Sequence, residues 1–113
     1  MECHLAARQY YDADEVWDEL HVGMPLELER DIDNRFDKNA VAVVLRKKNE
    51  ETGELEEFKL GYIPNGENEV LAQFLEMDWK ECFECRISKI NPEAHYENQI
   101  RLTVKIVRNE KNK

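Results

Sequence analysis

The sequence has few long hydrophobic runs, few cysteines and few residues that break secondary structure. Its longest apolar run, Ala40 to Leu45, has six residues, and the 113 residues include three cysteines, three prolines and four glycines. A membrane-spanning helix needs about 20 apolar residues, so an integral membrane protein is excluded. The N-terminus has neither a basic nor a long apolar stretch, so no secretory signal is predicted. An odd number of cysteines without such a signal predicts reduced thiols and a cytoplasmic location.

The chain also lacks a basic excess, because its net charge is −9 from 25 acidic and 16 basic side chains. The imbalance is uneven, since residues 1–79 carry −12 and residues 80–113 carry +3. A strongly acidic domain repels nucleic acid at long range, so any nucleic-acid role needs a local site. The simplest interpretation of the charge is solubility. The last two predicted strands carry four basic residues. These form either a stripe that could contact successive phosphates, called here a phosphate path, or an ordinary solvent-exposed face with cross-strand ion pairs. The four residues are Arg86, Lys89, Arg101 and Lys105.

The hydrophobic pattern predicts about six short strands and one helix. Alternating apolar and polar residues indicate half-buried strands, and the run Ala40–Leu45 indicates a strand buried on both faces. This predicts a single mostly β domain spanning residues 1–113, a small barrel with a polar C-terminal tail at 108–113. The strands are expected at Cys3–Tyr11, Leu26–Ile32, Ala40–Leu45, Phe58–Ile63, Trp79–Ile90 and Ile100–Ile106, the helix at Asn65–Asp78, a loop or helical turn at Asp12–Glu19 and a hairpin loop at Arg46–Leu55.

Patterns that carry catalysis or metal binding are weak. The sequence has no G-x-S-x-G, P-loop or G-x-G-x-x-G motif, and its three histidines are far apart. Cys82 and Cys85 form a C-x-x-C without a second pair, and in a strand they face opposite sides. One buried and one surface thiol is therefore the favoured interpretation. We expect no enzyme, metal or cofactor, although an enzyme using Cys82 or a histidine is a third, weakly supported class.

The most unusual segment encloses Phe36 between residues that favour turns: Asp33, Asn34, Asp37 and Asn39. In one interpretation it is a structured strand connection with Phe36 packed in the core. In the other it presents an aromatic platform beside a carboxylate. A base stacks on an aromatic face, while a carboxylate repels phosphate and accepts a hydrogen bond from a free hydroxyl. This second arrangement suits the end of a nucleic-acid strand better than its interior.

The sequence resembles the HIRAN domain over about residues 5–107. The resemblance lies in the strand Leu26–Asp31, the segment Asp33–Val43 with its D-x-N-A-V pattern, the L-G-Y-I-P motif at Leu60–Pro64, and the helix that follows. It implies a fold similar to oligonucleotide-binding barrels, with six strands and one or two helices. Some HIRAN domains belong to SWI/SNF-type translocases that remodel stalled replication forks, where they capture the free 3′-hydroxyl end of single-stranded DNA. Small bacterial HIRAN proteins also occur, and the chain is similar to those.

The resemblance also implies roles for individual residues. It makes Phe36 the stacking platform for the terminal base and Asp37 the acceptor of the terminal hydroxyl. Arg35 replaces the motif proline and adds a cation that would steady phosphate. Asn65 and Gln9 stand where basic residues are usual, which weakens two phosphate contacts. The implied DNA-binding residues are Tyr10, Tyr11, Arg35, Phe36, Asp37, Tyr62, Asn65 and Tyr96.

The resulting prediction is a non-catalytic module that binds single-stranded DNA ends and is linked to DNA repair or fork processing. It would act as an adaptor, with a DNA repair enzyme as a possible protein partner. The alternative is a protein-interaction or structural module with the same fold and no nucleic-acid binding. One geometric expectation follows: Phe36 and Asp37 should face one open concavity.

Overall fold

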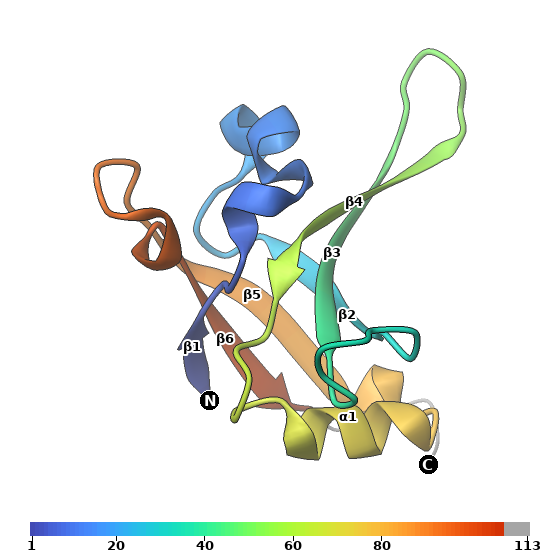
Figure 1. Cartoon of the computed structure of the whole chain (residues 1–113). Helices are drawn as coiled ribbons and strands as arrows, with labels where there is room; N and C mark the ends of the chain where they lie inside the picture. The colour runs from blue at the N-terminus through green and yellow to red at the C-terminus, as the bar shows by residue number, and fades with distance from the viewer. Residues whose placement is uncertain (108–113) are drawn as a thin grey trace.

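The computed structural model describes residues 1–107, apart from the side chain of Lys80, so the predicted tail at 108–113 lies outside the described residues. Six antiparallel strands form one sheet in the order β1-β6-β5-β2-β3-β4 (Figure 1). The elements are β1 (Glu2–His4), the 3₁₀ helices η1 (Arg8–Tyr10) and η2 (Asp12–Glu19), β2 (Pro25–Arg30), β3 (Val41–Lys48), β4 (Leu55–Tyr62), α1 (Glu69–Glu76), η3 (Lys80–Cys82), β5 (Phe83–Ile90), η4 (Tyr96–Asn98) and β6 (Ile100–Ile106).

The mostly β prediction is confirmed, but a closed barrel is not. The outermost strands β1 and β4 share no ladder. A single bridge joins the chain just after β1 to the end of β4, where the backbones of Ala6 and Tyr62 exchange hydrogen bonds of 2.8 and 2.9 Å. The sheet therefore curls until its two ends touch at one point. In Figure 1, α1 runs across one end of this curl, while η1 and η2 lie toward the other.

The core confirms the buried strand predicted from Ala40–Leu45. Every residue from Val41 to Leu45 is buried, because β3 lies inside the sheet between β2 and β4. Leu5, Leu60 and Ile100 complete the centre with no exposed surface. The described residues include no helix long and apolar enough to cross a membrane.

Several predicted boundaries are wrong. The strand expected at Leu26–Ile32 ends at Arg30, and the hairpin loop expected at Arg46–Leu55 is shorter, because β3 runs to Lys48 and β4 begins at Leu55. The first strand stops at His4, since Ala7 adopts a left-handed conformation with φ of 59° and starts η1. The helix begins only at Glu69, because Gly66 has φ of +93° and interrupts any earlier turn. The strand expected from Trp79 begins at Phe83, after the short η3.

Gly61 allows the chain to close where the sheet ends meet. A Cβ at this position would lie 2.4 Å from the backbone oxygen of Ala6 and 3.0 Å from the side chain of Leu5. Real Cβ atoms do not approach backbone so closely. The glycine of the L-G-Y-I-P motif is therefore needed for close approach of two backbones.

The C-x-x-C pair is divided as predicted into a buried thiol, Cys85, and a partly exposed one, Cys82. Burial raises the pKa of Cys85 to about 12 and that of Cys3 to about 11. Both thiols are therefore protonated at neutral pH and closed to reagents. Within residues 1–107, no group of three or more metal-ligating side chains is placed to hold an ion.

This difference predicts a simple labelling pattern. We expect a thiol reagent at neutral pH to modify Cys82 first, and Cys3 and Cys85 only after unfolding, because only the accessible thiolate reacts. Counting labelled thiols against time, with and without denaturant, measures this. Cys82→Ser should remove the native-state reaction, and rapid labelling of more than one thiol would contradict the burial.

Candidate nucleic-acid interface

Two tyrosines and a lysine form an aromatic and cationic cluster where the two ends of the sheet touch. The rings of Tyr11 and Tyr62 meet edge to face, with centroids 5.4 Å apart. The ammonium of Lys59 lies 5.3 Å from both ring centroids and donates a 3.1 Å hydrogen bond to the Tyr62 hydroxyl. That hydroxyl donates a 2.6 Å hydrogen bond to a carboxylate oxygen of Asp31. We call Tyr11, Lys59, Tyr62 and Asp31 the tyrosine cluster.

An irregularity in β4 brings Lys59 and Tyr62 together. Gly61 pairs with Val43 and Lys59 pairs with Val44, so Leu60 is an extra residue in the ladder. In a regular strand, residues three apart face opposite sides, whereas a bulge shifts the alternation by one residue. The backbone N–H of Lys59 also donates a 3.1 Å hydrogen bond to Asp12, which ties η2 to this point.

Electrostatics fix the protonation of this cluster. The hydrogen bond from Tyr62 is the main cause that holds the pKa of Asp31 below its usual range. Burial, followed by the same hydrogen bond, raises the pKa of Tyr62 well above that of a free phenol. Near neutral pH the cluster therefore contains a carboxylate, a neutral phenol and an ammonium ion.

The shifted phenol can be observed directly. We expect Tyr62 to stay neutral until the pH is well above about 10, since its ionisation would place two negative charges in contact. Phenolate absorbance is measured against pH for the wild type and Tyr62→Phe. The two curves should coincide up to that pH and separate only above it. Loss of an ionisation step centred near pH 10 in Tyr62→Phe would contradict the hydrogen bond to Asp31.

The neighbouring loop is organised by Asn34. Its side-chain N–H₂ lies 3.4 Å from the Asp31 carboxylate, and its side-chain oxygen accepts hydrogen bonds of 2.9 and 3.0 Å from the backbone N–H groups of Phe36 and Asp37. The loop that contains Phe36 and Asp37 is therefore connected to the tyrosine cluster through Asp31. It is a rigid connection between β2 and β3, as its turn-forming residues predict.

Within this loop, the expectation that Phe36 and Asp37 share one concavity is wrong. The ring of Phe36 is 96% exposed. Both carboxylate oxygens of Asp37 accept hydrogen bonds from inside the protein, at 2.8 Å from the N–H of Asn39 and 2.7 Å from the side chain of Asn68. The ring and the carboxylate face different surroundings because adjacent loop residues turn apart. Phe36 is also not packed in the core, which excludes the simpler interpretation of its role.

The other predicted residues are spread around this region. Tyr10 is largely exposed on η1, and Arg35 and Asn65 are exposed on loops. Tyr96 lies against Arg8, its ring centroid 5.3 Å from the guanidinium carbon. The structure thus brings together Tyr11 and Tyr62 of the predicted set. The contribution of each of these residues to DNA binding stays a prediction.

The comparisons with known proteins agree with this architecture. A family model of the HIRAN domain matches residues 1–108. The chain belongs to the HIRAN domain family. HIRAN domains are known as nucleic-acid-binding modules. A crystal structure of a Lactobacillus plantarum protein superposes with a TM-score of 0.69 at 21% identity, covering 91% of this chain and 87% of the other, which supports the fold alone. No curated protein matches the sequence significantly.

Most of the basic residues of β5 and β6 that were predicted as a phosphate path lie beside carboxylates, while Lys89 lies opposite Arg101 in the ladder. Arg86 pairs with Glu84, and Arg101 pairs with Glu2 at 3.0 Å. Lys105 lies directly opposite Glu84 in the ladder between the two strands. These contacts favour the interpretation of an ordinary solvated face with ion pairs.

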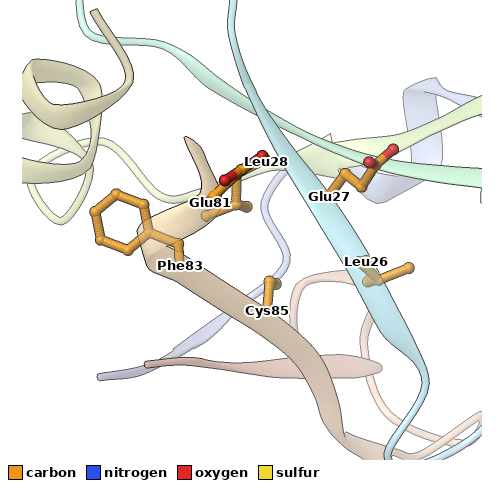
Figure 2. Close-up of a pocket in the computed structure, with 6 residues that line it drawn as sticks. All are labelled: Leu26, Glu27, Leu28, Glu81, Phe83 and Cys85. Atoms are coloured by element: carbon orange, nitrogen blue, oxygen red, sulfur yellow. The ribbon is translucent and has the colours of Figure 1, made fainter. Parts of the chain in front are cut away.

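A hollow of about 410 Å³ between β2 and β5 is a poor nucleic-acid site (Figure 2). The ladder joins these strands only at Pro25–Arg86 and Leu26–Cys85, and beyond this point they diverge. The lining contains two carboxylates and no basic side chain, so it repels phosphate. The lining residues are Leu26, Glu27, Leu28, Glu81, Phe83 and Cys85.

Three residues of functional interest are not indicated by the sequence patterns. Lys59 and Asp31 complete the tyrosine cluster, and Arg8 is a nearly buried cation. Lys59 precedes the motif tyrosine by three positions, which in a regular strand would place it on the far face. Asp31 ends the acidic strand of the HIRAN pattern, and nothing in the sequence distinguishes it from neighbouring carboxylates.

Proposed function

We propose that this HIRAN domain binds the 3′-hydroxyl end of single-stranded DNA without catalysis, through the tyrosine cluster and the adjoining loop. The observation that carries the proposal is the contact of Lys59 with two tyrosine rings. Its ammonium uses one N–H group on a neutral phenol, so the others can donate to a phosphate, although Asp31 offsets part of its charge. Bases stack on aromatic rings whatever their sequence. A lysine between two rings therefore suits single-stranded nucleic acid despite the net charge of −9.

The carboxylates near the cluster support binding at an end rather than within a strand. Asp31 touches Tyr62, and Asp37 lies on the loop held by Asn34. A DNA strand that continued beyond the site would bring the next phosphate toward these negative charges. A terminal hydroxyl instead donates a hydrogen bond to a carboxylate. The proposal keeps Asp37 as this acceptor, because its side chain is only partly buried and an ionised carboxylate can accept more than the two hydrogen bonds that it receives from the protein.

Phe36 is the residue proposed to stack with the terminal base. Its ring is 96% exposed, so one face is open to a base without any rearrangement. Tyr10, Arg35 and Asn65 are exposed, and the proposal takes them as candidates to contact the DNA backbone. A role as an adaptor that brings a repair or fork-processing enzyme to DNA ends remains a prediction from the family resemblance.

The proposal is tested with matched lysine variants. A short single-stranded oligonucleotide with a 5′ label and a free 3′ end is titrated with wild type, Lys59→Gln and Lys48→Gln, with anisotropy as the readout. Lys48 is an exposed lysine of the β3–β4 hairpin and serves as the control. Loss of one phosphate contact should weaken Lys59→Gln about tenfold and reduce the salt slope by about one. Equal binding by both variants would refute the role of the cluster.

A second candidate is a protein-interaction module. An open hollow of about 570 Å³ beside α1 and β6 has mostly apolar lining, and two of its side chains, Val70 and Ile106, are exposed. Clustered exposed apolar side chains of this kind occur at protein interfaces. Absence of binding to any single strand at low salt would favour this candidate over the first.

A further inference from the structure

Part of one edge of β2 has no neighbouring strand. The ladder between β2 and β5 includes Leu26 opposite Cys85 and, within the described residues, goes no further along β2. If the same register continued, Leu28 would lie opposite Phe83, the first residue of β5, and the partner of Arg30 would lie in η3, which is not extended. β5 therefore begins too late along the chain to pair with the last residues of β2.

The backbone groups at this edge point toward the space that β5 leaves open. On the other side of β2, Asp31 donates a 3.0 Å backbone hydrogen bond to Ala40, in the register that pairs β2 with β3. Hydrogen-bonded and non-hydrogen-bonded pairs alternate along an antiparallel ladder, so Leu28 and Arg30 direct their N–H and C=O groups away from β3. The same alternation begins at Met24, whose oxygen accepts a 3.1 Å bond from β5. Two positions of β2 thus offer donors and acceptors that no strand uses within residues 1–107.

The hollow of about 410 Å³ between β2 and β5 lies at this edge (Figure 2). Leu28 and Phe83 line it from the two diverging strands, and Leu26 and Cys85 line it where the strands meet. All four side chains are apolar, and those of Leu26, Leu28 and Cys85 are buried. Successive side chains of a strand point to opposite faces. A strand added to β2 would therefore find an apolar surface for the side chains on one of its faces.

The other face of such a strand would lie beside acidic side chains. Glu27 and Glu29 alternate with the buried leucines along β2. The guanidinium of Arg46 on β3 forms ion pairs with both of them and with Glu57. Three carboxylates share one guanidinium, so this group keeps a negative charge in a chain whose net charge is −9. Basic side chains on the outer face of an added strand are therefore attracted, and acidic ones are repelled.

We propose that the open edge of β2 binds an extended peptide of a partner protein in which apolar and basic residues alternate. The peptide adds a strand antiparallel to β2, as β5 does further back, and its main chain bonds to Leu28 and Arg30. Its apolar side chains enter the hollow, and its basic side chains lie beside Glu27 and Glu29. An unpaired strand edge is a template for such addition. The site uses no part of the tyrosine cluster, so failure of DNA-end binding would leave this inference standing, and the reverse also holds.

The test uses a synthetic peptide of eight alternating valine and lysine residues, titrated into the ¹⁵N-labelled full chain. We expect saturable shifts of the backbone amide signals of Leu28 and Arg30, and none from a peptide of alternating valine and glutamate at equal concentration. Absence of these shifts with the basic peptide would overturn the proposal. Shifts confined to Val70 and Ile106 would also overturn it, because they would place the peptide in the hollow beside α1.

Methylated peptides test the main-chain bonds without changing the protein. In an antiparallel hydrogen-bonded pair the two side chains share one face, so the valine nitrogens of the peptide face β2. Methylating these nitrogens removes the N–H donors and should weaken binding by at least about tenfold. The peptide methylated at its lysine nitrogens is the matched control and should keep its affinity. Equal weakening by both modifications would refute strand addition at this edge.

A pair of charge variants tests the outer face. Glu27→Gln removes a carboxylate of β2, and Glu56→Gln removes one of the β3–β4 hairpin. Each variant changes the net charge by the same amount. Glu27→Gln should weaken the valine–lysine peptide by about threefold, while Glu56→Gln should bind it as the wild type does. Equal affinities of the two variants would show that only the net charge attracts the peptide, which would contradict the proposed site.

Discussion

Gly61→Ala is expected to destabilise the protein by about 3 kcal/mol, near the upper end of the cost of overpacking. The added methyl group would lie 2.4 Å from the backbone oxygen of Ala6 and 3.0 Å from Leu5, which has no exposed surface. Neither atom can move away freely, because Ala6 exchanges two backbone hydrogen bonds with Tyr62. The substitution therefore forces the two ends of the sheet apart. Denaturant unfolding of the two proteins measures the loss.

The matched control for Gly61 is another glycine with open space around it. Gly66 has φ of +93°, and a Cβ added there would meet no atom within 4 Å. Gly66→Ala should cost only about 1 kcal/mol, the strain of a left-handed alanine. A loss at Gly61 no larger than the loss at Gly66 would contradict the close approach of the two backbones.

Asn68→Asp is the second substitution with a large expected effect, again about 3 kcal/mol at neutral pH. Asn68 is 2% exposed and donates a 2.7 Å hydrogen bond to Asp37. An aspartate here removes the donor and places a second carboxylate against the first in a buried position. Like charges in contact raise the pKa of one member of the pair. The bond between the loop and the start of α1 would be lost.

The loss at Asn68→Asp should depend on pH in a definite direction. The raised pKa in the folded state means that the folded protein binds a proton that the unfolded chain releases near pH 4, roughly. The loss in the free energy of unfolding is therefore largest above the raised pKa of the folded state. It becomes smaller as the pH falls toward the pKa of the same carboxyl group in the unfolded chain. Asn65→Asp, at an exposed position, is the control and should change stability by less than about 0.5 kcal/mol. A loss at Asn68→Asp that does not recede in acid would exclude paired carboxylates.

Much of the fold could be predicted from the sequence because the strands follow simple patterns. The alternation in Ile100–Ile106 marks one buried face, and this strand was placed correctly. The apolar run Ala40–Leu45 located the buried part of β3, which continues to Lys48 as a polar arm of the hairpin. The end of the first strand was placed wrongly, since the left-handed turn at Ala7 uses a residue that seldom adopts it. The predicted closed barrel was not confirmed, because whether a sheet closes depends on how far it curls, and no local sequence pattern determines this.

The candidate site was predictable only where a motif fixed the residue. Tyr11 and Tyr62 follow from the family pattern, and the structure brings their rings into contact. Lys59 could not be found, because the bulge at Leu60 reverses the face that alternation assigns to it. Adjacency in sequence suggested that Phe36 and Asp37 act side by side. The hydrogen bonds of Asn34 and Asn68 instead turn the ring outward and the carboxylate inward.

The bond between Asp37 and Asn68 also affects how the central claim should be tested. Replacing Asp37 would disturb the loop as well as the proposed acceptor, so a change in the DNA is cleaner than a change in the protein. The direct measurement compares the affinity of the wild type for one single strand ending in a 3′-hydroxyl and for the same strand ending in a 3′-phosphate. We expect the hydroxyl strand to bind at least about tenfold more tightly at both low and moderate salt, because the added phosphate meets carboxylates. Equal affinity for the two strands would contradict recognition of the 3′ end.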